Sequence, residues 1–456
     1  MQAEIIKRIE GKKVAILGFG KEGISTYKYI RKHLPNQKLY IVSIENNVDN
    51  PVVTEDQNLD FIFGSDYLNN LEEYDLIIKS PGVPLKDIDV TKLNITSQIG
   101  LVLEDGGFFT IGITGSKGKS TTTSLIYEVL KAQNKDAYLL GNIGIPIFDY
   151  IENFNENSYL VIEMAALQLE YVKASPNIAC LLNLFEEHLD FFGTYEKYCL
   201  AKLNIFKYQK NNDIGFYNEN NITLNNYIQK GNYTSDLTKI NCTIDLKDTN
   251  ENGIYIENDF ICYKFNGQIK KLYNINDERS LLGTHNLENI AFVLGVALKL
   301  NLDIELAIKT INNFKPLEHR MELVGTYNGI TFYNDSIATI PEATIHCIEA
   351  LKNVDTLIFG GKDRGISYDD FIDYLQNCSV NNFICMPNTG TNIGKMLKNK
   401  NVYFISDMQE IVEKAFEITK KGKSCLLSPA ASSYNAFKNF EEKGRLYKEA
   451  VKNCAK

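Results

Sequence analysis

The chain has 456 residues, a length that exceeds one ordinary hydrophobic core and favours two or three domains. Its hydrophobic fraction of 44% and charged fraction of 23% are typical of a globular protein and exclude the disordered and fibrous classes. The net charge of -9 disfavours nucleic acid as a partner, and with neither a membrane-length apolar run nor a signal peptide we expect a cytoplasmic protein with no membrane partner.

The first segment begins with a strand, a glycine-rich turn and a helix. The apolar run Lys12 to Leu17 leads into Gly18-Phe19-Gly20-Lys21-Glu22-Gly23, a strict G-x-G-x-x-G, and Glu45 ends the next strand at the spacing of a ribose-binding acid. Taken alone, this pattern is typical of a NAD site. A later strand, residues 74–79, runs into the sharp turn Ser80-Pro81-Gly82, and open α/β sheets bind ligands at such strand ends.

The second segment carries the most specific motif of the chain, the phosphate-type loop Gly112-Ile113-Thr114-Gly115-Ser116-Lys117-Gly118-Lys119-Ser120-Thr121, between an apolar strand at 108–114 and a helix at about 119–132. Its glycines let backbone N–H groups converge on phosphate oxygens, and the helix N-terminus adds positive potential. Lys119 can reach the β- and γ-phosphates and Ser120 can bind Mg²⁺, so the motif predicts an ATP site. A strict P-loop has glycine at the position of Ile113, so this loop is a variant.

The third segment again alternates strands and helices. Strands are expected near Ile330 and at 356–359, 382–386, 402–405 and 424–427. A linker is expected at Phe314-Lys315-Pro316, after two helical patterns. The sequence therefore predicts three α/β units in series.

The loop has the form T-G-x-x-G-K-[ST]-T and resembles that of the Mur ligase family, and further blocks match in order along essentially the whole chain. These blocks are Asn142-Ile143-Gly144, Glu163 with Gln168-Leu169-Glu170, Asn183 through His188 to Asp190, Ala201-Lys202, Gly283 through Asn289, Glu318 through Glu322, Asn334-Asp335-Ser336, Ser428-Pro429-Ala430 and Phe437 through Gly444.

The resemblance implies three domains: a Rossmann-like UDP-binding domain at residues 1–107, a central P-loop ATPase domain with a mostly parallel sheet at 108–314, and a Rossmann-like, glutamate-binding α/β domain at 315–456. It also implies a cytoplasmic step of peptidoglycan synthesis. ATP would phosphorylate the carboxylate of UDP-N-acetylmuramoyl-L-alanine, and the amine of D-glutamate would attack the acyl phosphate. ATP and Mg²⁺ would be the cofactors, and we expect a monomer.

Roles for single residues follow from the resemblance by position. Lys119, His188 and Lys202 would be catalytic, and the metal would be held by Ser120, Glu163, His188 and, if carbamylated, Lys202. The ATP-binding residues would be Gly115, Ser116, Lys117, Gly118, Lys119, Ser120, Thr121, Asn286, Asn289, Arg320 and Asp335.

Substrate binding would draw on all three segments. Phe19, Gly20, Lys21, Glu45, Ser80 and Gly82 would hold the UDP part, in place of NAD. The remaining substrate contacts would be Asn142, Gln168, His188, Thr339, Lys362, Arg364, Ser432, Ser433 and Phe437, the last five of which include the cations and hydroxyls expected for glutamate.

The chain departs from the family pattern at two places. Ile337 stands where the glutamate-adding enzymes usually have lysine, and Ala165 and Ala166 replace paired serines. Both changes concern the choice of acceptor, so ligation of L-glutamate is the main alternative. An inactive regulator on the same fold and a NAD-dependent oxidoreductase are alternatives from other classes.

Overall fold

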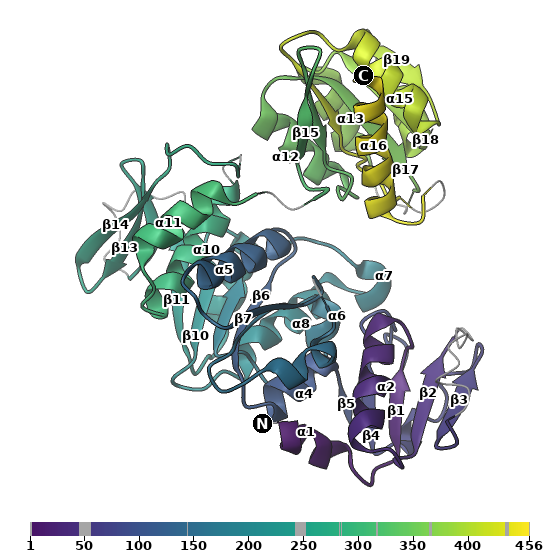
Figure 1. Cartoon of the computed structure of the whole chain (residues 1–456), viewed down its shortest axis with the longest axis vertical. Helices are drawn as coiled ribbons and strands as arrows, with labels where there is room; N and C mark the ends of the chain where they lie inside the picture. Colours follow the sequence, from purple (N-terminus) through teal and green to yellow (C-terminus); the bar gives the residue numbers. More distant parts are fainter. Residues whose placement is uncertain are drawn as a thin grey trace. The chain divides into compact units, whose positions relative to one another are not determined.

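The computed structural model describes residues 2–44, 56–143, 145–241, 252–281, 283, 285–315, 318–363, 367–433 and 437–455. The chain forms two compact units, one of Met1–Glu278 with Leu287–Asn312 and one of Arg279–Asn286 with Asn313–Lys456. Among the described residues, the first unit holds two sheets and the second unit holds one (Figure 1).

The first sheet is entirely parallel, with strand order β3-β2-β1-β4-β5. Its strands are β1 (Val14–Leu17), β2 (Leu39–Ser43), β3 (Leu59–Phe63), β4 (Leu76–Lys79) and β5 (Ile95–Thr96). The central strands β1 and β4 are buried at every residue, as expected for a parallel sheet covered on both faces. Their carboxyl ends therefore lie side by side at one edge.

The second sheet has the order β14-β13-β12-β11-β10-β9-β6-β8-β7, and only the β12-β13 and β13-β14 pairs are antiparallel. Its strands are β6 (Phe109–Thr114), β7 (Ala137–Gly141), β8 (Tyr159–Glu163), β9 (Ile178–Leu181), β10 (Ile214–Asn218), β11 (Asp236–Asn241), β12 (Gly253–Glu257), β13 (Phe260–Phe265) and β14 (Gln268–Asn274). Because β6 lies between β8 and β9 and is parallel to both, the carboxyl ends of these three strands lie side by side at the phosphate-type loop.

Helices connect and cover these two sheets (Figure 1). They are α1 (Gln2–Ile9), α2 (Lys21–His33), α4 (Gln98–Asp105), α5 (Lys119–Ala132), α6 (Ala166–Leu169), α7 (Leu189–Phe192), α8 (Tyr195–Lys207), α9 (Ile222–Lys230), α10 (His285–Lys299) and α11 (Ile304–Asn313). Short 3-10 helices lie at Leu71–Glu73, Ile147–Asp149 and Ile151–Asn153. Several of the α-helices begin after a residue whose side chain accepts a backbone N–H of the first turn, such as Ser97 before α4 and Thr194 before α8.

The sheet of the second unit has the order β15-β16-β20-β17-β18-β19 and is parallel except for the β15-β16 hairpin. Its strands are β15 (Glu322–Tyr327), β16 (Ile330–Asn334), β17 (Val354–Gly361), β18 (Asn382–Asn388), β19 (Asn401–Phe404) and β20 (Ser424–Leu427). Its helices are α12 (Pro341–Leu351), α13 (Asp369–Asn377), α14 (Thr389–Gly394), α15 (Met408–Ile418) and α16 (Phe440–Cys454). Two separate apolar clusters pack on the sheet, and α15 and α16 lie together on one of its faces.

These sheets confirm the predicted α/β class and the mostly parallel central sheet. Across the described residues, no helix is both long enough and apolar enough to span a bilayer.

Candidate active site

The glycine-rich turn of the first domain joins β1 to α2 at the carboxyl edge of the first sheet. A Cβ at Gly23 would lie 2.2 Å from the Gly18 carbonyl oxygen, so this position requires glycine. Ser80, from the end of β4, donates its hydroxyl to the same oxygen at 3.0 Å. Phe19 is buried, whereas Gly20 is exposed. The predicted turn and the Ser80 turn are thus adjacent.

Two further residues predicted for the UDP part lie at the same edge. Lys21 and Gly82 are both exposed, next to the Gly20 and Pro81 positions of the two turns. Glu45, predicted as a ribose contact, lies outside the described residues.

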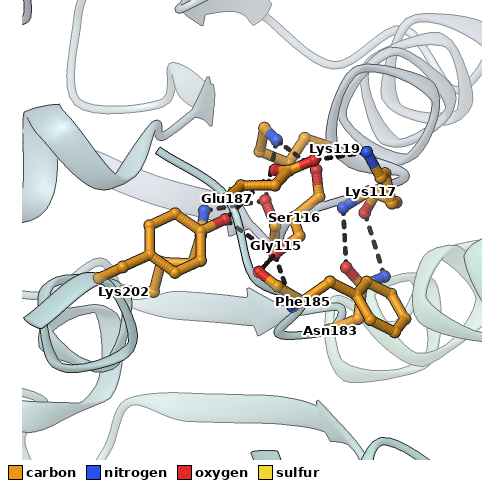
Figure 2. A network of polar contacts seen from close by, with 9 residues as sticks. Gly115, Ser116, Lys117, Lys119, Asn183, Phe185, Glu187 and Lys202 are labelled. Atoms are coloured by element: carbon orange, nitrogen blue, oxygen red, sulfur yellow. Dashed lines mark hydrogen bonds and ion pairs between the residues drawn. The ribbon is translucent and has the colours of Figure 1, made fainter. Parts of the chain in front are cut away.

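The phosphate-type loop connects β6 to α5, as predicted. Gly118, which precedes the helix, has a left-handed backbone with φ of 82°, a conformation that favours glycine. The loop is tied to Asn183, because Lys117 N–H donates to Asn183 Oδ1 at 2.7 Å and the Asn183 amide donates to Lys117 O at 3.2 Å. Lys117 also forms an ion pair with Glu187 (Figure 2).

Ser116 and Lys119 are held inside this loop. The Ser116 hydroxyl contacts the Tyr198 hydroxyl at 2.8 Å and accepts the Phe185 N–H at 2.8 Å. The Lys119 ammonium donates to Gly115 O at 2.8 Å and to Ser116 O at 3.0 Å (Figure 2). The predicted phosphate-binding cation is therefore held at the loop itself.

Glu163 ends β8 beside the loop and is 1% exposed. Its Oε1 accepts the Asn142 side-chain amide at 2.8 Å, while its Oε2 is buried and has no hydrogen-bond partner. A buried carboxylate oxygen without a donor is costly unless something else satisfies it, and Mg²⁺ prefers such hard oxygen ligands. The arrangement of Glu163 fits a metal ligand.

Lys202 projects from α8 toward the same loop. Its ammonium donates to Gly115 O at 2.8 Å and to Thr114 Oγ1 at 3.3 Å, and it lies 4.9 Å from the centre of the Tyr198 ring. Burial, together with the nearby charge of Lys119, lowers the pKa of Lys202 well below its ordinary value. The structure therefore brings Lys119, Glu163 and Lys202 around one loop.

His188 and Gln168 lie on neighbouring connections of the same unit. His188 precedes α7 with a left-handed backbone, φ 57°, and its exposed ring packs near the rings of Tyr198 and Phe191. Gln168 accepts the Ala165 N–H at 3.0 Å and donates to Glu22 Oε2 at 3.3 Å. Ala165 thus contributes only its backbone, and Gln168 links α6 to the first domain.

The first turns of α5 and α10 also meet. Asn289 is buried, and its Oδ1 accepts the Thr122 hydroxyl at 3.1 Å and lies 2.6 Å from where a Cβ of Gly118 would stand. Ser120 is half-buried and Thr121 is buried at the start of α5. Asn286 is also buried, but it belongs to the second unit.

In the second unit, Asp335 follows β16 and is fully buried. Its Oδ2 accepts the hydroxyl of Ser428 at 2.8 Å and the thiol of Cys347 at 3.0 Å, and its Oδ1 accepts the Met321 N–H at 3.1 Å. Burial raises the pKa of Asp335 to about 6. The Nε of the half-buried Arg320 has no hydrogen-bond partner, so it can still take an acceptor.

The residues predicted for glutamate lie on three connections of the second unit. Lys362 is exposed after β17, and its N–H donates to Ser432 O at 2.8 Å. Ser433 is buried and its hydroxyl has no partner, while Thr339 and Phe437 are half-buried. Arg364 lies outside the described residues.

Comparison with known proteins gives the same family for the middle and the C-terminal parts of the chain. The family model of the Mur ligase middle domain matches residues 113–297, and that of the Mur ligase, glutamate ligase domain matches residues 319–431. A UDP-N-acetylmuramoylalanine--D-glutamate ligase of Clostridioides difficile (strain 630) is 33% identical over 98% of this chain and 99% of its own length. The chain belongs to the Mur ligase family.

Further relatives agree. A UDP-N-acetylmuramoylalanine--D-glutamate ligase of Thermoanaerobacter sp. (strain X514) is 35% identical over 97% of this chain and 98% of its own length. The crystal structure of MurF ligase from Thermotoga maritima in complex with ADP has a TM-score of 0.59 and 19% identity, covering 98% of this chain and 97% of that chain. At that identity the likeness concerns the fold, and it confirms the predicted three-domain Mur ligase architecture.

Several residues around the loop were not predicted. Tyr198 lies one helical turn before Lys202, and this i, i+4 spacing on α8 was the available signal that both face the loop. The ion pair of Glu187 with Lys117 had no local signal, because 70 residues separate the partners. Likewise, only the three-dimensional structure places the Glu22 carboxylate beside Gln168.

Proposed function

We propose that this Mur ligase joins D-glutamate to the alanyl carboxylate of UDP-N-acetylmuramoyl-L-alanine, with conversion of ATP to ADP and phosphate. The observation that carries the proposal is the similarity to ligases of that name at 33 and 35% identity along nearly the whole of both chains. The cluster of Lys119, Glu163 and Lys202 around a phosphate-type loop supports it, because activation of a carboxylate by ATP requires cations and a metal ligand.

In the first step, the alanyl carboxylate oxygen bonds to the γ-phosphorus while the bond from that phosphorus to the β,γ-bridging oxygen breaks, and ADP leaves. Lys119 would neutralise charge on the transferred oxygens, and the N–H groups of Gly115 to Ser120 would hold the phosphates. Thr121 and Asn289 would support this loop at the starts of their helices. Asn286, Arg320 and Asp335 would be further nucleotide contacts.

The metal expected with ATP is Mg²⁺, and the residues at the loop fit it. The unpartnered Oε2 of Glu163 and the hydroxyl of Ser120 are oxygen ligands of the right type. When bound, the ion supplies positive charge that polarises the phosphoryl oxygens. The Asn142 amide orients Glu163 by occupying its other oxygen.

Lys202 would serve as a carbamate. Its amine is fully buried and donates only to neutral oxygens of the loop and of Thr114 among its recorded contacts. Reaction with CO₂ forms an N–C bond, opens one C=O double bond and releases a proton to solvent. The resulting anion would complete a metal site with His188, whereas a bare ammonium beside a cation would be repelled.

In the second step, the amine of glutamate attacks the acyl carbon, the bond from that carbon to the phosphate oxygen breaks, and the amine loses a proton. Glutamate would contact Thr339, Lys362, Arg364, Ser432, Ser433 and Phe437. The muramoyl-alanine part would lie against Asn142, Gln168 and His188, with its UDP part on Phe19, Gly20, Lys21, Glu45, Ser80 and Gly82. The NAD reading of the first turn is thereby replaced by a UDP site.

We further propose that the three domains span residues 1–107, 108–314 and 315–456, because the strands of the three sheets lie at 14–96, 109–274 and 322–427. We also propose that the protein is a monomer in the cytoplasm. Size-exclusion chromatography with light scattering tests the monomer.

The deciding experiment follows ADP release with UDP-N-acetylmuramoyl-L-alanine and Mg²⁺-ATP, in parallel reactions with D-glutamate and with L-glutamate. Turnover with D-glutamate supports the proposal. Turnover only with L-glutamate keeps the ligase chemistry and reverses the stereochemistry, an outcome that Ile337 in place of the usual lysine makes worth testing. Silence with both acceptors supports an inactive regulator.

A further inference from the structure

A buried lysine lies at the start of the last helix of the second unit. Lys443 is in the first turns of α16 and is 1% exposed, although charged side chains are rarely buried without a partner. The ammonium is therefore a feature that the packing of α16 alone does not explain.

No counter-charge accompanies this amine in the part of the chain that the structure describes. The recorded contact of Nζ is the Phe437 ring, whose centre is 5.4 Å away. Burial alone lowers the pKa of Lys443 to about 7. A ring contact offsets only part of the cost of burying an ammonium, so the charged form is suited to an anion that arrives from outside.

Two carboxylates, one on α16 and one on β15, are engaged with other groups. Glu442 accepts the Lys438 N–H at 2.7 Å, and Glu322 pairs with Lys448 at 2.8 Å. Neither of these two carboxylates forms an ion pair with Lys443.

A buried hydroxyl without a partner lies beside Gly444, the residue that follows this lysine in α16. Ser336 is 0% exposed and its Oγ has no partner, and a Cβ on Gly444 would stand 2.4 Å from that oxygen. Ser336 immediately precedes Ile337, the position at which the usual lysine is missing. The start of α16 therefore adjoins the segment that has lost a cation.

We infer that Lys443 binds a carboxylate of the incoming glutamate and replaces the cation missing at Ile337. This inference rests on the proposed function. Glutamate brings two carboxylates and an apolar stem, which match an ammonium over an aromatic ring and an unpartnered hydroxyl beside the next residue of the helix, Gly444. A phosphate of the nucleotide has the same charge chemistry, so the experiment must separate the two anions.

The test compares the wild type with K443M, which keeps the length of the side chain without its charge, and with K443R, which keeps the charge. Initial rates of ADP release are measured against D-glutamate and then against ATP. In K443M the glutamate KM should rise about tenfold or more, with the ATP KM changed less than about twofold. K443R should remain within about threefold of the wild type for both substrates.

K448M is the matched control on the same helix. It breaks the ion pair with Glu322 and should lower the thermal midpoint while leaving the glutamate KM unchanged. If K443M does not fold, K443Q supplies a neutral, polar side chain for the same measurement.

An unchanged glutamate KM in a folded neutral variant would overturn the inference, and so would a rise confined to the ATP KM. These outcomes require a wild type that turns over with glutamate. A wild type without turnover refutes the proposed function itself, and the inference about Lys443 falls with it.

Discussion

Replacing Glu163 with glutamine should separate activity from stability. In the folded chain one carboxylate oxygen accepts the Asn142 amide and the other has no donor, so glutamine can keep the first contact in nearly the same volume. The substitution removes a buried charge that the Asn142 amide satisfies at only one of its two oxygens, so we expect the free energy of unfolding to change by no more than about 1 kcal/mol. The proposed metal ligand is lost, and kcat should fall by about 10² to 10³, which corresponds to roughly 3 to 4 kcal/mol.

The assay pairs urea denaturation with steady-state ADP release over a range of Mg²⁺ concentrations. Glu219→Gln is the control, because Glu219 also accepts an asparagine amide, that of Asn241 at 2.8 Å, but pairs with Lys239. That variant should lose stability and keep its activity. Normal kcat and normal Mg²⁺ dependence in Glu163→Gln would refute the assignment of Glu163 as a metal ligand, whereas unfolding would refute the structural argument.

Three further predictions concern buried groups of the first unit. Burial raises the pKa of Glu22 from 4.5 to about 7. The contribution of Glu22 to stability is therefore full below about pH 4.5 and is lost as the pH rises through about 7. In urea titrations, the free energy of unfolding of Glu22→Gln should exceed that of the wild type by up to about 3 kcal/mol at pH 8.5 and by little at pH 5. An equal difference at both pH values would contradict this. Lys202→Met should lower kcat about a hundredfold, and bicarbonate should not change the rate of this variant. The rate of the wild type should fall in CO₂-free buffer and recover when bicarbonate is added. A wild-type rate that does not depend on CO₂ would argue against the carbamate. Gly23→Ala should destabilise the first domain by about 1 to 3 kcal/mol in thermal melts, because its Cβ would stand 2.2 Å from the Gly18 carbonyl oxygen, and an unchanged melt would show that the turn can relax.

The elements that carry local signals could be predicted from the sequence. The helix after the phosphate-type loop was predicted at about 119–132 and is observed at Lys119–Ala132, because glycine at 118 and the apolar spacing define it without help from the rest of the chain. The strand before it was expected to start at 108 and starts at Phe109, a difference of one residue at an end. The α/β class followed from the same alternation of strands and helices.

The environment of each side chain was beyond the sequence, because it depends on residues far away along the chain. Glu163 was a candidate ligand by position, but only the pairing of β7 with β8 brings Asn142 to its Oε1, and only the structure shows that Oε2 has no donor. Lys443 lies in a charged stretch of an amphipathic helix and reads as a surface residue until its burial is known. Glu22 was only the variable position of a glycine motif until Gln168 was found beside it.

The phosphate-type loop is held by hydrogen bonds to Asn183, Phe185 and Tyr198 of the same chain. The conformational entropy lost by ordering the loop is therefore part of the folding free energy, and nucleotide binding does not have to supply it. We therefore expect the association rate constant of ATP to be limited by diffusion and electrostatic attraction to an already ordered loop, and not by rearrangement of the loop. If the hydrogen bonds between Asn183 and Lys117 were removed, the entropy cost of ordering the loop would fall on the binding step. Nucleotide affinity would then be weaker, although no group that contacts the phosphates had been removed.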